Sequence, residues 1–287
     1  MQIVDTTRQT WDLVVPNTRG GDVFRKVIRA AEGGRRVSYD IRFERFGEGD
    51  RGYSSIRHRH DFDQLRFAAL GRMDLGFGVL EEGDVGYFPA NAYYGPQKCE
   101  GALILVAQWG DRFVTKEQSD QAVAELSEHG EFRDGIYRAV DEQGRPFNKD
   151  PLNAIWEHVF KERYRPQPPR YRQPVLITPS AFGWSVPAGP VRRRRLGAFT
   201  ENGLAVESVR WHEAGTFESS PGDGDHRPTF LFTTAGSFAH QGREFGPHTG
   251  VWADPGEGLA IDGAADSELL MVRLPAPSSR MTLDPDA

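Results

Sequence analysis

The stretch RHRHDFDQ, residues 57–64, places two histidines one residue apart and a glutamine four positions after the second. Alternate side chains of a β-strand point to the same face, so His58 and His60 are expected to project side by side, about 6–7 Å apart. Two imidazoles at that spacing can share a metal ion. They can also be ordinary side chains of a strand that binds no metal. The rest of the chain has to distinguish these two interpretations.

The composition is that of an ordinary globular protein. Charged residues make up 26% and hydrophobic residues 38% of the 287, and this length suffices for one large domain or two ordinary ones. The net charge of -6 argues against a nucleic acid or an anionic membrane as the main partner. The longest apolar run is too short to cross a bilayer, and the beginning of the sequence lacks a signal-peptide pattern. The single cysteine, Cys99, excludes an intrachain disulfide, so we expect a cytoplasmic protein.

Short strand-like segments separated by glycine- and proline-rich turns occupy both ends of the chain. In the first half they cover residues 35–46, 54–60, 64–70, 84–89 and 102–109. Between the two strand-rich parts, capping patterns predict helices over 115–130 and 150–164, followed by the proline-rich segment 165–174. This pattern predicts a barrel or sandwich at each end. We therefore divide the chain into an N-terminal barrel (1–112), a helical and proline-rich linker (113–171) and a C-terminal barrel (172–287).

The residues around the histidine pair resemble the first sequence signature of the cupin superfamily. That signature is a glycine, five residues, a histidine, one residue, a second histidine, three or four residues, a glutamate, six residues and a glycine. The matching positions here are Gly52, His58, His60, Gln64 and Gly71. The spacing agrees throughout, and only the glutamate is replaced, by Gln64.

A weaker match to the second cupin signature follows at a suitable distance. Gly83 and Pro89 agree with it, whereas Asn91 stands at a glycine position and Lys98 at an asparagine position. Tyr94 takes the place of the histidine that completes the metal site in the family. The two signatures together cover roughly residues 35–110.

The resemblance implies a mainly β fold with two cupin-type jelly-roll antiparallel β-barrels joined by a helical linker. The second strand-rich half is similar to a degenerate copy of the first. If Gly236 corresponds to Gly71, then Asp223, Asp225 and Thr229 stand where the first barrel has its two histidines and its glutamine. The resemblance thus implies a bicupin with one retained site.

In the family, two histidines, a glutamate and a later histidine hold a divalent metal. Carried over, the metal ligands are His58, His60 and Gln64, with Tyr94 completing or orienting the site. Gln64 offers an amide oxygen but no negative charge, and a phenol has an ordinary pKa of about 10. Imidazole and oxygen ligands favour Fe(II), with Zn, Ni or Mn as alternatives, and a metal-free site stays open.

Arg66 lies two residues beyond Gln64 and is expected on the same face of the strand. Inside a barrel its guanidinium needs an anionic partner, either a substrate carboxylate or enolate, or a nearby acidic side chain. Asp61 and Asp63 are expected to face the other way and to be solvated.

These observations predict a small-molecule enzyme with its site in the first barrel. The leading hypothesis is a metal-dependent oxygenation, or a C–C or C–O bond rearrangement, of an aromatic or anionic metabolite, with Tyr94 and Arg66 as catalytic residues. One alternative is a metal-free isomerase or cyclase that uses histidine and tyrosine as acid–base groups. Another is a ligand-binding cupin without activity. The expected partner is a small molecule rather than nucleic acid or membrane, and a homodimer stays open.

Overall fold

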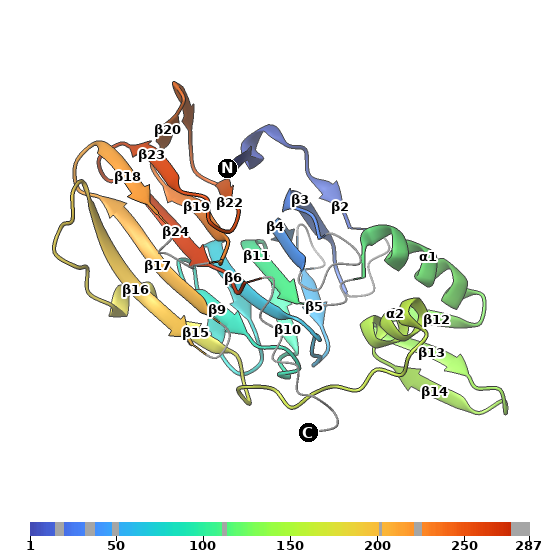
Figure 1. The fold of residues 1–287 in the computed structure, drawn as a ribbon. Helices are drawn as coiled ribbons and strands as arrows, with labels where there is room; N and C mark the ends of the chain where they lie inside the picture. The colour runs from blue at the N-terminus through green and yellow to red at the C-terminus, as the bar shows by residue number, and fades with distance from the viewer. Residues whose placement is uncertain are drawn as a thin grey trace. The chain divides into compact units, whose positions relative to one another are not determined.

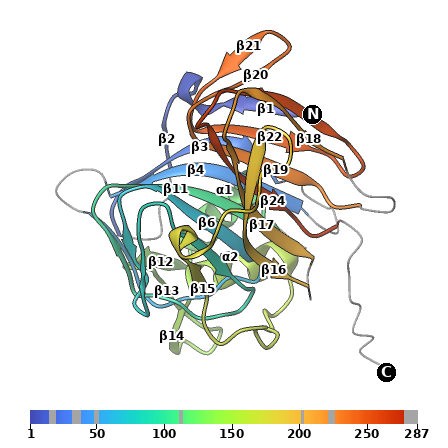
Figure 2. The same cartoon turned by 90° about the vertical axis from the view of Figure 1, so that its left-hand side faces the viewer.

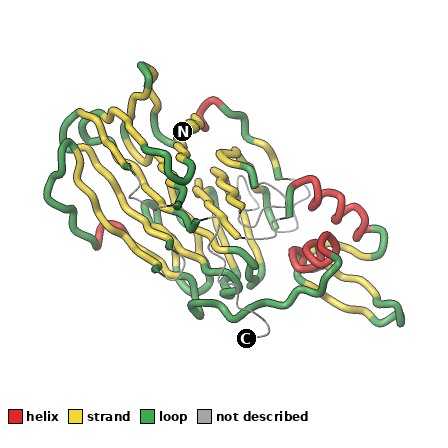
Figure 3. The backbone as a smooth tube through the Cα atoms, viewed as in Figure 1, coloured by secondary structure: helices red, strands yellow, loops and turns green. Residues whose placement is uncertain are grey.

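The computed structural model describes residues 1–14, 20–31, 38–47, 52–110, 114–200, 203–220 and 226–276 (Figure 1). The chain divides into two compact units. We call Trp11–Leu176 the first barrel unit. The second barrel unit combines Met1–Thr10 with Ile177–Ala287. Strands dominate both units (Figure 3), which confirms the predicted mainly β fold.

The first barrel unit contains two sheets with a shared apolar core. The larger sheet consists, in spatial order, of β15 (Val175–Ile177), β9 (Val85–Phe88), β6 (Asp63–Leu70), β11 (Ala102–Gly110), β4 (Ser38–Phe46), β3 (Val23–Arg29) and β2 (Asp12–Leu13). The smaller one consists of β5 (Tyr53–Ser55), β10 (Gln97–Cys99), β7 (Met73–Asp74) and β8 (Val79–Leu80). Side chains from both sheets, among them Phe46, Phe88 and Met73, pack into one cluster. This is the jelly-roll arrangement that the sequence predicted.

Strand β11 explains why one segment of the sequence is apolar without alternation. It pairs with β4 on one side and β6 on the other, in antiparallel register. Ile104 and Leu105 are successive residues, so they point to opposite faces of the sheet, and both are fully buried. A strand buried on both faces needs apolar side chains on both, which is why ALILVA is uninterrupted.

The segment between the barrels contains the two predicted helices, α1 (Lys116–Ser127) and α2 (Pro151–Phe160). Thr115 and Gln118 form the expected capping box, and Asp150 caps α2 by accepting hydrogen bonds from two backbone N–H groups. The segment is not helical throughout. An antiparallel sheet of β12 (Gly130–Arg133), β13 (Ile136–Val140) and β14 (Pro146–Lys149) stands between the helices. The linker therefore carries a sheet that the helix signals alone did not predict.

The second barrel unit also has two sheets. The larger one consists of β1 (Gln2–Asp5), β22 (Thr249–Ala253), β19 (Thr229–Ala235), β24 (Glu268–Arg273), β17 (Leu204–Trp211) and β16 (Val191–Phe199). The smaller one consists of β18 (Gly215–Ser219), β23 (Leu259–Gly263), β20 (Phe238–His240) and β21 (Arg243–Phe245). Two short 3-10 helices, η1 (Thr6–Arg8) and η2 (Pro179–Ala181), complete this unit.

Strand β1 changes the division that we predicted for the chain. It pairs antiparallel with β22 from Gln2 opposite Trp252 to Asp5 opposite Thr249 (Figure 2). The first ten residues therefore belong to the second barrel unit, although the predicted division placed them in the first barrel. The predicted linker (113–171) groups with the first barrel unit, and so do residues 172–176, which the predicted division gave to the C-terminal barrel.

The core of the second barrel unit is packed closely around Trp211. This indole is fully buried, and a Cβ added at Gly263 would lie 2.1 Å from its ring. Glycine is therefore required at this place on β23, because the backbone passes directly over the ring. Within the described residues, no helix is long and apolar enough to cross a membrane.

Candidate functional site

The histidine pair lies just beyond a strand rather than within one. The strand predicted over 54–60 ends at Ser55, and His58 makes only an isolated bridge with Tyr94. In that bridge each backbone N–H donates to the other residue's carbonyl oxygen, at 3.0 Å. On either side of Tyr94 the backbone has positive φ, 64° at Asn91 and 97° at Gly95, so no regular strand continues there. The rings of His58 and His60 are nevertheless neighbours, with centroids 5.1 Å apart.

His58 is held in one tautomer by its own loop. The side chain is buried, and Nδ1 lies 2.7 Å from the carbonyl oxygen of Ile56. Because a carbonyl oxygen can only accept, Nδ1 carries a proton, and in the neutral ring Nε2 carries the lone pair. Nε2 is therefore the atom that can bind a metal or take up a proton.

His60 lies at a more open place in the same loop. Its side chain is half-buried and stacks on Phe62, with ring centroids 4.7 Å apart. Its carbonyl oxygen accepts a hydrogen bond of 2.6 Å from the backbone N–H of Asn91. Its ring lies 5.9 Å from that of Tyr94, compared with 4.5 Å for His58. Tyr94 thus lies nearer to His58 than to His60.

Gln64, Arg66 and Tyr94 form a buried hydrogen-bonded triangle. Gln64 and Arg66 share a face of β6 because they are two residues apart. Arg66 Nη2 donates to Gln64 Oε1 at 3.2 Å and to the Tyr94 hydroxyl oxygen at 3.1 Å. Gln64 Nε2 also donates to that oxygen, at 3.3 Å. The fold therefore brings together the five side chains singled out in the sequence.

The guanidinium of Arg66 is surrounded by neutral groups. It lies over the ring of Phe88, 4.6 Å from the centroid, and over that of Tyr94 at 5.2 Å. Nη1 contacts the sulfur of Met73 at 3.6 Å. Among the residues that the structure describes, no carboxylate oxygen lies within 4.0 Å of this side chain, which is 6% exposed. The acidic partner that was one option for Arg66 is thus not found among these residues.

Asp63 is buried, so the expectation that it would be solvated is wrong. Its carboxylate accepts hydrogen bonds from Arg170 Nη1 at 3.1 Å to each oxygen and from the Tyr87 hydroxyl at 2.8 Å. Burial, together with this neighbouring carboxylate, raises the pKa of Tyr87 well above its usual range. Strand alternation correctly turns Asp63 away from Gln64. It could not show that the proline-rich segment supplies Arg170 to that face.

Tyr164, the residue just before the proline-rich segment, contacts the histidine loop. The Tyr164 hydroxyl donates to Asn91 Oδ1 at 2.6 Å, and Asn91 in turn holds the carbonyl of His60. Burial, with Asp61 nearby, raises the pKa of Tyr164 above its usual range. Tyr164 therefore stays a neutral hydrogen-bond donor, and it stabilises the histidine loop through Asn91.

The five side chains do not fit a divalent metal in this arrangement. No group of three or more histidine, cysteine, aspartate or glutamate side chains in the described ranges could hold one. His58 and His60 offer nitrogen ligands, but the oxygens of Gln64 and Tyr94 already accept hydrogen bonds from the cationic Arg66. No ligand in the set brings negative charge, and a cation near those oxygens would be repelled by the guanidinium.

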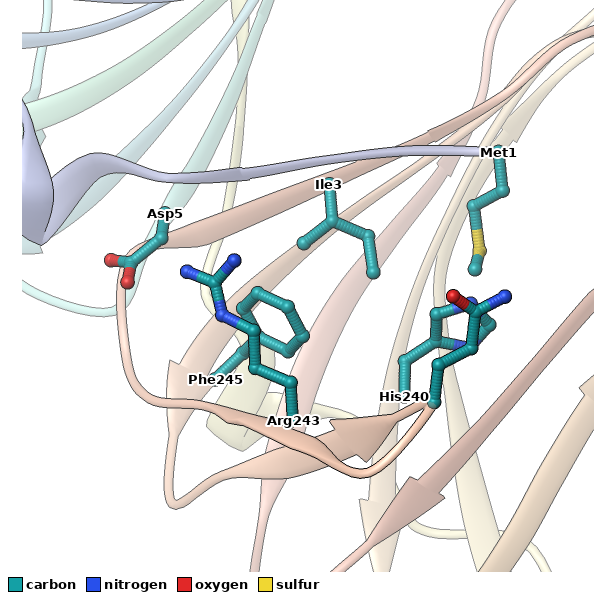
Figure 4. A pocket seen from close by; sticks show the side chains of 7 residues that line it. Met1, Ile3, Asp5, His240, Arg243 and Phe245 are labelled. Carbon is teal, nitrogen blue, oxygen red and sulfur yellow. The ribbon is translucent and has the colours of Figure 1, made fainter.

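The second barrel unit offers no comparable cluster in the part of the chain described. Asp223 and Asp225 lie outside the described residues, and Thr229 begins β19. A pocket of about 390 Å³ lies beside β1 and the β20–β21 hairpin, lined by Met1, Ile3, Asp5, His240, Gln241, Arg243 and Phe245 (Figure 4). It contains a single histidine, whose Nδ1 lies 3.2 Å from the carbonyl oxygen of Ala260. This pocket therefore does not repeat the paired histidines of the first unit.

Comparison with known proteins identifies the fold. No protein-family model matches the chain, and no curated protein matches it in sequence. Three solved structures are similar over nearly its whole length. A provisionally assigned dioxygenase from Nostoc punctiforme is 13% identical, with a TM-score of 0.63, covering 98% of this chain and 84% of that one. The Streptomyces albus enzyme HEPD, with 2-hydroxyethylphosphonate and Fe(II) bound, is 13% identical, with a TM-score of 0.54, covering 99% and 77%.

The third structure is oxalate decarboxylase from Bacillus subtilis, 12% identical, with a TM-score of 0.53, covering 96% of this chain and 76% of that one. At such identities the likeness concerns the fold. These neighbours are cupin-fold proteins, and the similarity extends over both barrel units. The chain therefore has a cupin fold with two barrels.

Proposed function

We propose that the first barrel unit is the active site of a small-molecule enzyme that works by proton transfer. The observation that carries this proposal is the convergence of His58, with its lone pair on Nε2, and Tyr94, whose oxygen is hydrogen-bonded to Arg66. Histidine and tyrosine are both proton-transfer groups, and burial shields them from bulk water. Enzymes among the solved structures of the same fold support an enzymatic role in general.

The chemistry follows from these three side chains. His58 Nε2 accepts a proton from a carbon atom next to a substrate carbonyl. The Tyr94 hydroxyl gives a proton to another atom of the same substrate, and Arg66 stabilises the negative charge that develops meanwhile. One proton leaves the substrate and one is returned, so the product is an isomer and no electrons are exchanged. Solvent then restores the protonation of His58 and Tyr94. This corresponds to the isomerase or cyclase alternative.

A metal-dependent oxygenation or rearrangement is the second candidate. The lone pair at His58 Nε2 favours it, because that is the atom through which a histidine binds metal. The fold family implies a divalent metal, with Fe(II) first and Zn, Ni or Mn as alternatives. This candidate requires Gln64 and Tyr94 to give up their hydrogen bonds with Arg66.

Deuterium exchange tests the proton-transfer proposal without knowledge of the natural substrate. Small α- and β-keto acids are incubated with the protein in D₂O, and loss of the C–H signal is followed by NMR. We expect exchange that depends on the protein and that is lost in His58→Ala and strongly reduced in Tyr94→Phe. His226→Ala, at an exposed position of the second barrel unit, is the control. Equal exchange in His58→Ala, or turnover only with added Fe(II) and dioxygen, would instead favour the other candidates.

A further inference from the structure

We infer that Arg66 takes the functional place of the metal ion, as a built-in cation that binds the carboxylate of a small organic anion. The inference rests on the proposed function only in placing the site in the first barrel unit. It names the substrate class, which proton-transfer chemistry alone leaves open.

The first evidence for an anion site is that the charged side chain of Arg66 is buried. Arg66 is 6% exposed, and a guanidinium is a cationic group. A buried charge is unfavourable unless an opposite charge or a full set of hydrogen bonds compensates it. Within the described ranges the guanidinium meets two neutral oxygens, a sulfur and two aromatic rings. An anionic ligand would supply the missing opposite charge.

The hydrogen bonds show which edge of the guanidinium would take the anion. Nε and Nη2 donate to Gln64, and Nη2 also donates to Tyr94. Among described groups Nη1 reaches only the sulfur of Met73, a weak acceptor. Nη1 is thus the nitrogen with donor capacity to spare. A carboxylate oxygen accepts such a hydrogen bond strongly, and its single charge matches the single guanidinium.

The outer side of the histidine loop supports an anionic ligand independently. Arg57 and Arg59 alternate with the histidines, and their guanidiniums lie 4.9 and 4.7 Å from the centroid of the Tyr93 ring. Tyr93 is 42% exposed. Arg57 and Arg59 bring two positive charges against the one negative charge of Asp61 in the same loop, and a positive excess raises the local concentration of anions.

The first test concerns metal content. The protein is purified after growth with Fe, Mn, Ni and Zn, and bound metal is measured by mass spectrometry. We expect less than 0.1 equivalent in the unchanged protein, and close to one equivalent when Arg66→Met is combined with Gln64→Glu, which restores the ligand that the family uses. Adding His58→Ala to that pair should remove the metal again. About one equivalent of metal in the unchanged protein would overturn the inference.

The second test concerns anion binding. Calorimetric titrations use benzoate, pyruvate and inorganic phosphate, with benzamide as the uncharged match to benzoate. We expect benzoate or pyruvate to bind at least tenfold more tightly than benzamide or phosphate, and Arg66→Met to abolish the difference. Arg72→Met, the same change at an arginine with a 69% exposed side chain, should leave it intact. Arg66→Lys keeps the charge, so this variant should bind benzoate several-fold more weakly and still exclude metal.

Each possible result of these titrations supports or refutes the proposed anion site. Preferential binding of phosphate would refute the carboxylate assignment. Absence of binding by all three anions, or equal binding by Arg66→Met in folded protein, would refute the anion site. Deuterium exchange that depends on His58 would stand in either case, so failure here differs from failure of the proposed reaction.

Discussion

The two barrel units share a fold but carry different buried side chains on the corresponding strand. With Gly71 placed opposite Gly236, Arg66 on β6 corresponds to Leu231 on β19. Leu231 is fully buried in the apolar core of its unit, whereas Arg66 is buried among hydrogen-bonding groups. In the second unit this position stabilises the barrel. In the first, a charge occupies it, and we propose that this charge serves binding at a cost in stability.

The contrast teaches where to look for function in a duplicated fold. An apolar core residue needs no further explanation, because burial alone accounts for it. A buried polar group at the equivalent position requires a role, because the fold has shown that an apolar side chain suffices there. By this criterion Arg66 is the position that we propose as functional, whereas its neighbour Gln64 corresponds to Thr229, which is also polar.

The largest expected effect comes from exchanging the two residues. Leu231→Arg should lower the free energy of unfolding by about 4 kcal/mol or more, because it puts an unpaired charge into an apolar core. Arg66→Leu should leave stability unchanged or raise it, because it removes a buried charge. Chemical denaturation followed by circular dichroism measures both. A loss of stability in Arg66→Leu as large as in Leu231→Arg would break the comparison.

The second-largest expected effect is a loss of activity when a histidine of the first unit is replaced. His58→Ala should reduce the rate of substrate deuterium exchange by roughly 10²–10⁴-fold, the usual contribution of a general base. His240→Ala in the second unit should change that rate less than twofold, since this residue lies in the other barrel. NMR rates for both variants check this. A similar loss in His240→Ala would move the active site out of the first unit.

Breaking one ion pair in each unit should give the next, smaller difference in stability. Asp63→Asn removes the charge that holds Arg170 and should lower the free energy of unfolding by about 1–3 kcal/mol, because the carboxylate is buried and accepts several hydrogen bonds. Asp266→Asn breaks the exposed pair with Arg210 in the second unit and should have an effect below about 0.5 kcal/mol. Thermal unfolding at several salt concentrations distinguishes the two. Equal effects would mean that the ion pair between Asp63 and Arg170 stabilises the protein no more than an exposed surface pair does.

The smallest effect tests whether Tyr164, just before the proline-rich segment, serves the site. Tyr164→Phe removes the hydrogen bond to Asn91, and Thr6→Val removes one to the carbonyl of His248 in the second unit. Each should cost about 1 kcal/mol of stability. Only Tyr164→Phe should also lower kcat/KM, because Asn91 holds the loop of His60. An unchanged kcat/KM in Tyr164→Phe would show that this contact is purely structural.

Local signals in the sequence predicted local structure well. The capping residues Thr115 and Asp150 placed both helices, because a cap depends on residues three or four positions away. The cupin-like spacing predicted the jelly roll, and strand alternation placed Gln64 and Arg66 on one face. The roles of these side chains stay predictions until the variants are measured.

Long-range pairings could not be predicted in the same way. Arg170 is 107 residues from Asp63, and no periodicity relates them. The early end of the strand at Ser55 depends on positive φ angles in the segment that faces it. The hydrogen bonds of Arg66 depend on Met73 from another strand and on Tyr94 from the segment opposite the histidine loop. Such features follow from the assembled barrel rather than from any window of the sequence.

The pairing of β1 with β22 has a consequence for the order in which the chain is made. Gln2 lies opposite Trp252, so the ribosome adds 250 residues after Gln2 before its partner is complete. At about 5–20 residues per second this takes roughly 12–50 s. During that time the first barrel unit, complete at Leu176, can fold, while β1 still lacks its neighbour. The closing of β1 onto β22 should thus be among the last events of synthesis, and a stalled chain that ends before β22 should expose β1 to protease.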